Sequence, residues 1–435
     1  MNPNALGIPK VPACITLPPT GCEAPLTEMQ AQLLGGVRRF ADEVLRPTGA
    51  VLDRLSPEEV VAPESPLWTV FARFADLGLS VGALAQLPED DLAVLLPLFW
   101  EELGRGDAGL AISLGVGMLP ALMLASWGRL DVLARVGEQQ LGCWGITEPD
   151  HGSDVLDADR RVFDPVGEYG KPNCLATRRD GRIVLNGQKA AWVSNGGIAQ
   201  ICLLYTAFDR GRGPGEGGVL LVPLDRPGVS RGRPLDKLGQ RALNQAEIFF
   251  DDVELEEELL VAGPEQYRDA VYSILAEANA SMGAVFTGVA QAAYDAALAY
   301  AHQRRQGGVP IIVHQSVRQR LFHMFRRVEA ARALARRVFR YNATAAIPAL
   351  QGSIAAKVTA TQTAFDVASD ALQLFGGNGL SREYPIEKIL RDARASMIED
   401  GCNEMLSIKG GSYLIDPEAL RAGSNGHDVS GEAWA

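Results

Sequence analysis

The residues best suited to chemistry in this 435-residue chain form neither a metal-site pattern nor a nucleophile pattern. The five histidines show no HExxH spacing and no cluster with cysteine, so metal catalysis is not indicated. No GxSxG sequence is present to expose a serine nucleophile, which argues against a serine hydrolase. No GxGxxG follows an early strand, so a Rossmann nicotinamide site is not indicated either.

Two other stretches have residue types that bind anions. The glycine-rich run at 211–218 lacks the terminal Lys and Ser/Thr of a P-loop and precedes an expected strand, so it predicts a hairpin loop. The helix expected at 317–341 is rich in arginine, and we interpret it as an exposed or subunit-facing stripe paired with carboxylates. The alternative is an anion site for a phosphorylated cofactor. Its arginines are Arg318, Arg320, Arg326, Arg327, Arg332, Arg336, Arg337 and Arg340.

The elements that must position functional residues change in character twice along the chain. Between residues 26 and 140 apolar residues recur three and four apart, with Thr27 as a cap, which predicts helices. From 141 to 262 short apolar runs alternate with turn signals, which predicts strands. From Tyr267 an Ala-rich helical pattern returns and holds to about Leu414.

These patterns predict an α+β fold with helices on both sides of a β-domain in sequence order. We expect an N-terminal helical domain at 1–140, which includes an extended leader at 1–25. A middle β-domain follows at 141–262, then a C-terminal helical bundle at 263–420 and a mobile tail at 421–435.

Composition narrows the class of protein. A net charge of −12 and a pI near 5.1 argue against a nucleic-acid partner, because binding phosphates requires basic groups. The six cysteines are widely spaced without a CxxC, so reduced thiols and a cytoplasmic location are expected. Residues 108–128 are uncharged and long enough for a membrane span. Pro120 and four glycines argue instead for two buried helical pieces of a core, so we expect no membrane span.

Several blocks resemble the flavin-dependent acyl-CoA dehydrogenase superfamily, and they occur in the family's order. They are CWGITEPDHGSD at 143–154, AAWVSNGG at 190–197, QLFGGNGLSREYPIEKILRDAR at 373–394 and IEDGCNEM at 398–405, with DKLGQR at 236–241 as a supporting match. The resemblance implies a β-domain between two helical domains, the last a four-helix bundle, with FAD in the cleft between the β-domain and that bundle. It also implies a homotetramer or homodimer, with a heteromer left open. The implied reaction removes the α-proton of an acyl-CoA thioester with a carboxylate while flavin N5 takes the β-hydride, and an electron-transfer flavoprotein receives the electrons.

The resemblance also assigns roles to individual positions. Trp192 packs against the flavin ring, Ser194 donates a hydrogen bond toward N5, and Arg304 and the turn at 373–377 reach FAD from a neighbouring subunit. The implied substrate contacts are Ser153, Asn279 and Gly401. The implied cofactor contacts are Trp144, Ile146, Thr147, Ser153, Trp192, Val193, Ser194, Arg304, His314, Gln315, Gln373, Gly376, Gly377, Cys402 and Glu404.

The sequence departs from the family pattern where the base should be. The family's Tyr-Glu-Gly-Thr is Glu-Asp-Gly-Cys at 399–402, which puts Asp400 at the base position, one methylene shorter, and Glu399 beside it. Some relatives carry the base on the helix near 278, where this chain has Ala278 with Glu277 adjacent. The connection at 157–180 is longer than usual; we interpret it as a surface loop, with a lid or a subunit contact as the alternative.

Three hypotheses follow. The first is an FAD-dependent acyl-CoA dehydrogenase with Asp400 as the base, acting in acyl-CoA catabolism. The second is a flavoenzyme of the same fold with another reaction, such as a nitroalkane-type oxidase or an enzyme that removes a substituent from an acyl-CoA. The third is a non-catalytic subunit of a heteromeric dehydrogenase. Peroxide release separates the first two, and absence of flavin or turnover in the isolated chain supports the third.

Overall fold

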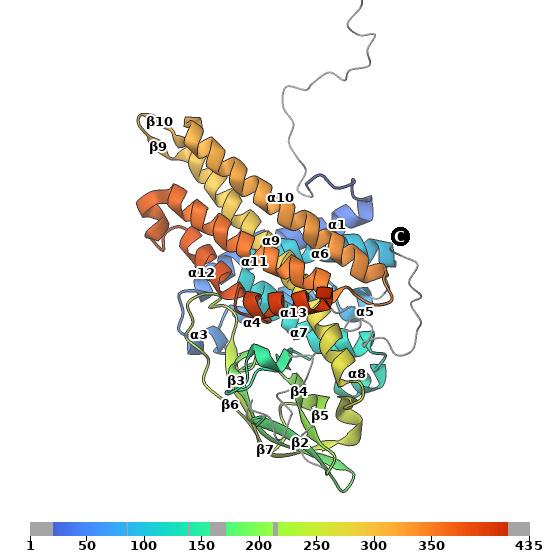
Figure 1. Ribbon diagram of the computed structural model, residues 1–435. Helices are drawn as coiled ribbons and strands as arrows, with labels where there is room; N and C mark the ends of the chain where they lie inside the picture. The colour runs from blue at the N-terminus through green and yellow to red at the C-terminus, as the bar shows by residue number, and fades with distance from the viewer. Residues whose placement is uncertain (1–20, 85, 138–139, 157–170, 212–215, 416–435) are drawn as a thin grey trace, which may run out of the picture.

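The structure is a computed structural model, and it describes all residues except 1–20, 85, 138–139, 157–170, 212–215 and 416–435. Helices of the N-terminal and C-terminal parts pack together, and the β-sheet lies below them in Figure 1. The order of elements is helical up to residue 136, β from 142 to 262, and mainly helical from 267 to 415. This confirms the predicted α+β class. The predicted tail lies outside the described residues.

The N-terminal helices begin where the sequence predicts. Thr27 caps the first of them, and its side chain and that of Gln30 each accept a hydrogen bond from the other residue's backbone N–H. The helices of this part are α1 (Glu28–Phe40), a π-helical segment (Ala41–Leu45), α2 (Arg46–Leu52), α3 (Pro57–Val61), α4 (Leu67–Ala75), α5 (Val81–Leu84), α6 (Glu89–Gly106), α7 (Ala108–Ser126) and α8 (Leu130–Val136).

The uncharged segment forms one continuous helix, α7, so the prediction of two helical pieces is wrong. Pro120 lies inside α7 and has no N–H to donate to the carbonyl of Val116. It packs directly against Gly142 of strand β1 (Gly142–Gly145), where an added Cβ would lie only 2.4 Å from the Pro120 ring. By length and composition α7 could cross a membrane, but 67% of its apolar window is buried inside the fold, as in a core helix.

The middle part is an eight-stranded sheet with the path β6-β7-β3-β2-β4-β5-β8, to which β1 adds by parallel pairing with β4. Strands β4 and β5 pair antiparallel and the glycine-rich run connects them, which confirms the predicted hairpin. Residues 216–218 of the run belong to β5, and residues 212–215 of the loop are not described. The end of the long connection expected at 157–180 is itself a strand, β2. The strands are β1 (Gly142–Gly145), β2 (Cys174–Arg179), β3 (Arg182–Ser194), β4 (Ile201–Asp209), β5 (Glu216–Pro223), β6 (Val229–Arg231), β7 (Gln245–Glu256) and β8 (Leu260–Ala262).

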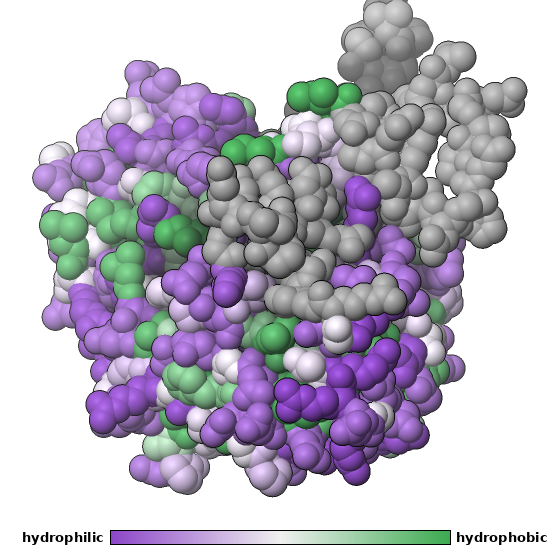
Figure 2. Space-filling view, turned by 60° about the horizontal axis from the view of Figure 1, so that its bottom comes forward, coloured by the Kyte–Doolittle hydropathy of each residue, from purple (hydrophilic) through white to green (hydrophobic). Residues whose placement is uncertain are grey.

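Figure 2 views the molecule with the β-sheet end of Figure 1 turned forward. Hydrophilic residues dominate this face, and hydrophobic residues occur there in separate patches. Strand β4 is instead covered on both faces: all eight residues from Ile201 to Phe208 are buried, and alternate residues of a strand point to opposite sides. The face in view therefore has the character of a solvated surface.

The C-terminal helices form the largest layer in Figure 1. Two long helices, α6 and α9, cross so closely that only glycine fits at the contact. A Cβ on Gly288 would lie 1.9 Å from the carbonyl oxygen of Glu101, and one on Gly104 would lie 2.0 Å from that of Val285. The elements are α9 (Tyr267–Gln303), the hairpin β9 (Arg305–Gln306) and β10 (Val309–Pro310), α10 (Gln315–Thr344), α11 (Leu350–Phe375), α12 (Ile386–Ser396) and α13 (Asn403–Ile415).

The arginine-rich helix α10 is only partly the exposed stripe that the sequence predicts. Arg320 and Arg327 pair with Asp370 near the surface, as expected. Arg332 and Arg336 are instead buried, and both bind Glu101 of α6, at 2.7 and 2.8 Å. These two guanidinium groups are internal ties between helices, so they do not belong to an exposed stripe.

A second polar cluster joins all three parts of the chain. Asp53, at the end of α2, is almost fully buried and accepts hydrogen bonds from Arg391 and Arg382 of the C-terminal part, at 2.7 and 2.9 Å to Oδ2. Its backbone oxygen accepts from Arg241, which follows β6 in the β-domain. We call these residues the Asp53 cluster. It connects the N-terminal helices, the β-domain and the bundle at one point.

Candidate active site

A cavity of about 670 Å³ lies where the β-domain meets the C-terminal bundle. Its walls come from α7, the loop after β1, the end of β3, the segment between β6 and β7, and the end of α12 with the turn that follows. The lining residues are Val116, Trp144, Ile146, Thr147, Gly152, Ser153, Trp192, Val193, Ser194, Asp236, Lys237, Leu238, Gly239, Gln240, Gln245, Arg394, Ala395, Ile398, Glu399, Asp400 and Gly401.

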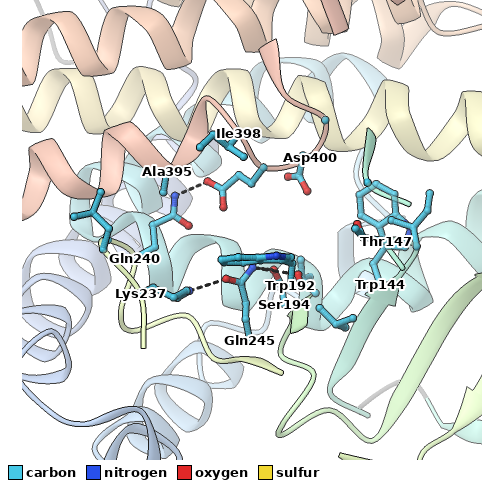
Figure 3. Close-up of a pocket in the computed structure, with 18 of the residues that line it drawn as sticks. Trp144, Thr147, Trp192, Ser194, Lys237, Gln240, Gln245, Ala395, Ile398 and Asp400 are labelled. Atoms are coloured by element: carbon cyan, nitrogen blue, oxygen red, sulfur yellow. Dashed lines mark hydrogen bonds between the residues drawn. The ribbon is translucent and has the colours of Figure 1, made fainter. Parts of the chain in front are cut away.

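The β-domain wall presents an exposed indole beside a hydroxyl group. Trp192 lies in the stretch of β3 where pairing with β7 is interrupted between Lys189 and Val193, and 61% of its surface is exposed. Figure 3 shows Trp192 and Ser194 together on the same side of the cavity. An exposed indole in a concave site can stack against a flat aromatic ring of a ligand.

A hydrogen-bond relay fixes the direction of the Ser194 hydroxyl. Lys237 Nζ donates to Gln245 Oε1 at 2.8 Å, so the amide nitrogen of Gln245 must face the other way. That nitrogen donates to Ser194 Oγ at 3.1 Å and to the carbonyl of Trp192 at 3.2 Å. Because Ser194 Oγ already accepts, its own proton is available to a group in the cavity (Figure 3).

The loop after β1 is held from behind by a buried ion pair. Lys189 Nζ lies 2.6 Å from Glu148 Oε1 and also donates to the carbonyl of Ile146 at 3.2 Å. The Ala190 N–H donates to the carbonyl of Thr147. These bonds position the Ile146 and Thr147 side chains at the cavity wall without using the side chains themselves.

The opposite wall is a tight turn that follows α12 and carries two carboxylates. Asp400 and Gly401 have φ angles of 52° and 88°, so two consecutive residues lie in the left-handed region. In Figure 3 the Asp400 carboxylate lies across the cavity from Trp192 and Ser194 and points into the space between them. The Cys402 N–H donates to Ser153 Oγ at 3.4 Å, which ties this turn to the loop after β1.

The two carboxylates of the turn differ in their hydrogen bonding. Glu399 Oε1 accepts a hydrogen bond from the amide of Gln240, which holds it against the segment between β6 and β7. Asp400 has no hydrogen bond to its carboxylate within the described part of the chain. Glu277, the other candidate, does not line the cavity; it accepts a bond from Ser281 on α9. The geometry favours Asp400 as the group that meets a substrate.

Burial makes both carboxyl groups weaker acids than usual. It raises the pKa of Asp400 from 3.8 to about 6, opposed by the positive charge of Lys357. Burial and then the negative charge of Asp400 raise the pKa of Glu399 from 4.5 to about 7. A base with a pKa near 6 is ionised at neutral pH and accepts a proton more readily than an ordinary aspartate.

Several predicted contacts are not among the residues that line this cavity. Asn279 is fully buried on α9, where its amide nitrogen donates to the carbonyl of Leu275 and its oxygen has no partner among the described residues. Cys402 is half-buried at the turn, just behind the lining residue Gly401. The other predicted contacts outside the cavity are exposed, namely Arg304, His314, Gln315, Gln373, Gly376, Gly377 and Glu404.

The cavity also contains polar residues that the sequence reading did not assign. Lys237 and Gln240 lie within the block DKLGQR at 236–241, which is part of the resemblance, so the motif contained a signal for them. Gln245 is an ordinary first residue of a strand, and nothing in its sequence context marks it.

The cavity has the features that a flavin requires. It offers the exposed Trp192 indole, against which a flavin ring can stack, and the hydroxyl groups of Ser194 and Thr147, which can bond the edge of that ring. Trp144 lines the same wall, and its indole N–H is buried without a partner among the described residues. An unsatisfied buried donor is costly, and an acceptor atom of a bound group would satisfy it. The residues that line the cavity therefore fit a flavin.

The fold and the cavity define a class of protein: two helical parts pack around a β-domain, and a carboxylate faces the exposed Trp192 indole across the cavity between them. Residues 143–253 match the model for "Acyl-CoA dehydrogenase, middle domain", and residues 269–409 match that for "Acyl-CoA dehydrogenase, C-terminal domain". The chain belongs to the acyl-CoA dehydrogenase family, and the class of enzyme expected from the sequence is confirmed.

Individual relatives agree with this placement. The chain is 30% identical to benzylmalonyl-CoA dehydrogenase of Aromatoleum aromaticum over 398 residues, which cover 88% of this chain and 97% of the relative. Its fold matches butyryl-CoA dehydrogenase from Megasphaera elsdenii with a TM-score of 0.78 at 26% identity, covering 91% of this chain and all of the other. A glutaryl-CoA dehydrogenase from Mycobacterium smegmatis, solved in complex with FADH2, matches in fold with a TM-score of 0.72 at 22% identity, covering 89% and 95%. The family is FAD-dependent.

Proposed function

We propose that this protein binds FAD and dehydrogenates an acyl-CoA thioester between its α- and β-carbons, with Asp400 as the base. One observation carries the proposal: the unbonded Asp400 carboxylate faces the exposed Trp192 across the cavity (Figure 3). A flavin ring stacked on Trp192 would leave room for a thioester chain between that ring and Asp400. The chain would then present its α-proton to the carboxylate and its other face to the flavin. FAD, when bound, supplies the acceptor for the β-hydride.

Asp400 removes the α-proton at a carboxylate oxygen, and its raised pKa favours that transfer at neutral pH. The developing negative charge on the thioester oxygen needs donors. The backbone N–H groups of Asp400 and Gly401 have no acceptor within the described residues, so they are available at the site where that charge forms.

The relay from Lys237 through Gln245 keeps the Ser194 proton directed into the cavity. We assign Ser194 to the hydrogen bond at the ring edge of the flavin, and Thr147 and Trp144 to further contacts there. The exposed positions around Arg304 and Gly376 are suited to FAD bound in a neighbouring copy, so we propose a homodimer or homotetramer. An electron-transfer flavoprotein is the proposed electron acceptor.

The test is anaerobic bleaching of the flavin by a panel of acyl-CoA thioesters. The panel includes short straight chains and thioesters with an aromatic or cyclic substituent, because one relative acts on benzylmalonyl-CoA. We expect Asp400→Asn to slow bleaching by the best thioester about 10²–10⁴-fold, the usual contribution of a general base. Glu399→Gln is the matched control, with a much smaller loss expected.

If Asp400→Asn bleaches at the wild-type rate, the base is assigned wrongly, and Glu399→Gln and Glu277→Gln identify the replacement. Peroxide release that keeps pace with turnover in air would favour the oxidase alternative over an electron-transfer flavoprotein.

A further inference from the structure

A buried lysine lies beneath the turn that carries Asp400. Lys357, on α11, is fully buried, and its Nζ donates to the carbonyl of Gly401 at 2.8 Å and to Asn403 Oδ1 at 2.9 Å. Removing an ammonium group from water is costly unless its protons are bound and its charge is balanced. Lys357 makes no ion pair with any described carboxylate, so its charge must be balanced at longer range.

The hydrogen bonds around Lys357 fasten the turn to α11. Asn403 Nδ2 donates to Thr361 Oγ1 at 3.1 Å, and Thr361 Oγ1 donates to the carbonyl of Lys357 at 2.9 Å. Asp400 has a left-handed backbone, which is disfavoured for a residue with a side chain. The bond from Lys357 to the next carbonyl, that of Gly401, holds the turn in this conformation.

The charge of Lys357 acts mainly on the same turn. Burial lowers the pKa of Lys357 to about 8, opposed first by Asp400 and then by Glu399, with Cys402 and Glu404 behind them. From the other side, Lys357 is the charge that opposes the raised pKa of Asp400. Lys237, in the segment between β6 and β7, also acts on Glu399. Arg394, at the end of α12, lines the same cavity as the turn.

We propose that Lys357 is a positioning residue for the base: its buried ammonium clamps the 400–401 turn and keeps the Asp400 carboxylate negatively charged. This inference rests on the proposed function, because it gives Lys357 a task in proton removal. Among the described residues, Lys357 Nζ donates hydrogen bonds to the Gly401 carbonyl and to Asn403 alone, so it acts on substrate through the turn.

The experiment measures the rate of anaerobic flavin reduction by the best thioester between pH 5.5 and 9, using the FAD-loaded enzyme. Lys357→Met keeps the apolar stem and removes the charge. Asn403→Asp keeps the lysine and places a carboxylate beside Nζ, which cancels the charge without emptying the site. Lys409→Met, the same change at a half-buried lysine of α13 whose Nζ lies over the Tyr413 ring, is the control. The FAD content of each variant shows whether the fold is intact.

The wild-type rate should rise with pH through an inflection near 6. Both Lys357→Met and Asn403→Asp should move that inflection upward by about 1 unit or more, the usual effect of removing a close opposite charge. Lys409→Met should leave it in place.

A slower rate with an unmoved inflection in both variants would show a purely structural role and overturn the inference. If Lys357→Met does not fold, Asn403→Asp alone decides the outcome. Failure of every thioester to bleach the wild type contradicts the proposed function itself, whereas a wild type that bleaches beside variants with unmoved inflections contradicts only this inference.

Discussion

Replacing Asp400 by asparagine should stabilise the protein while it removes activity. Burial raises the pKa of Asp400 from 3.8 to about 6. This difference means that folding costs about 3 kcal/mol more with the carboxyl group ionised than with it protonated. Because the side chain is half-buried beside the cavity, solvent screening reduces this to about 1–2 kcal/mol. Asparagine has nearly the same shape and carries no charge, so it escapes that penalty.

The pH dependence follows from the direction of the pKa change. A carboxyl group whose pKa is higher in the folded state has no cost below pH 3.8, where both states are protonated. The cost grows as the pH rises toward 6 and is complete above it. Asp400→Asn should therefore gain roughly 2 °C in midpoint temperature at pH 8 and nothing near pH 3.8, as measured by thermal melts across this range.

Asp225→Asn is the matched control, because Asp225 is exposed and does not line the cavity. It should leave the midpoint unchanged at every pH. A destabilised Asp400→Asn at pH 8 would refute the reasoning, because it would mean that the carboxylate stabilises the turn.

Three further changes test other parts of the structure. Trp192→Ala removes the indole on which the flavin ring stacks and should raise the dissociation constant of FAD about 3- to 10-fold, as measured by quenching of flavin fluorescence; an unchanged constant would place the ring elsewhere. Ser194→Ala removes one donor and should slow flavin reduction about 10²-fold, whereas Ser194→Thr, which keeps the hydroxyl, should stay close to wild type. Gly288→Ala forces a methyl group against the carbonyl of Glu101 and should destabilise the fold by about 1–3 kcal/mol in thermal melts, whereas Gly411→Ala, which meets nothing within 4 Å, should not.

Local patterns were sufficient for most of the fold. Thr27 and the spacing after it predicted the first helix, and the short apolar runs bounded by turns predicted the strands, because these signals depend on neighbours in sequence. Pro120 misled the prediction because a single lost hydrogen bond is outweighed by packing against β1, which follows the next helix in the chain. Burial of Arg332 was equally hidden, since its partner Glu101 is 231 residues away.

The site divides in the same way. Asp400, Ser194 and Trp192 belong to contiguous motifs, so the resemblance could point to them, and the structure places all three on one cavity. Lys357 is a lone lysine in an Ala-rich helix, and only the folded turn above it gives it a role. The choice between Asp400 and Glu399 as the base also required the structure, because it depends on which of the two carboxylates the Gln240 side chain bonds.

The Asp53 cluster has a consequence for how the enzyme is assembled. Its residue Arg391 also donates to the carbonyl of Leu238, in the same segment as Gln240, whose backbone N–H donates to Asp392 Oδ1. The wall of the cavity that holds Glu399 is thus aligned only when the N-terminal helices, the sheet and the bundle have all docked. The cofactor pocket should accordingly appear in the last step of folding, and FAD should protect segments remote from it against proteolysis as strongly as the pocket itself.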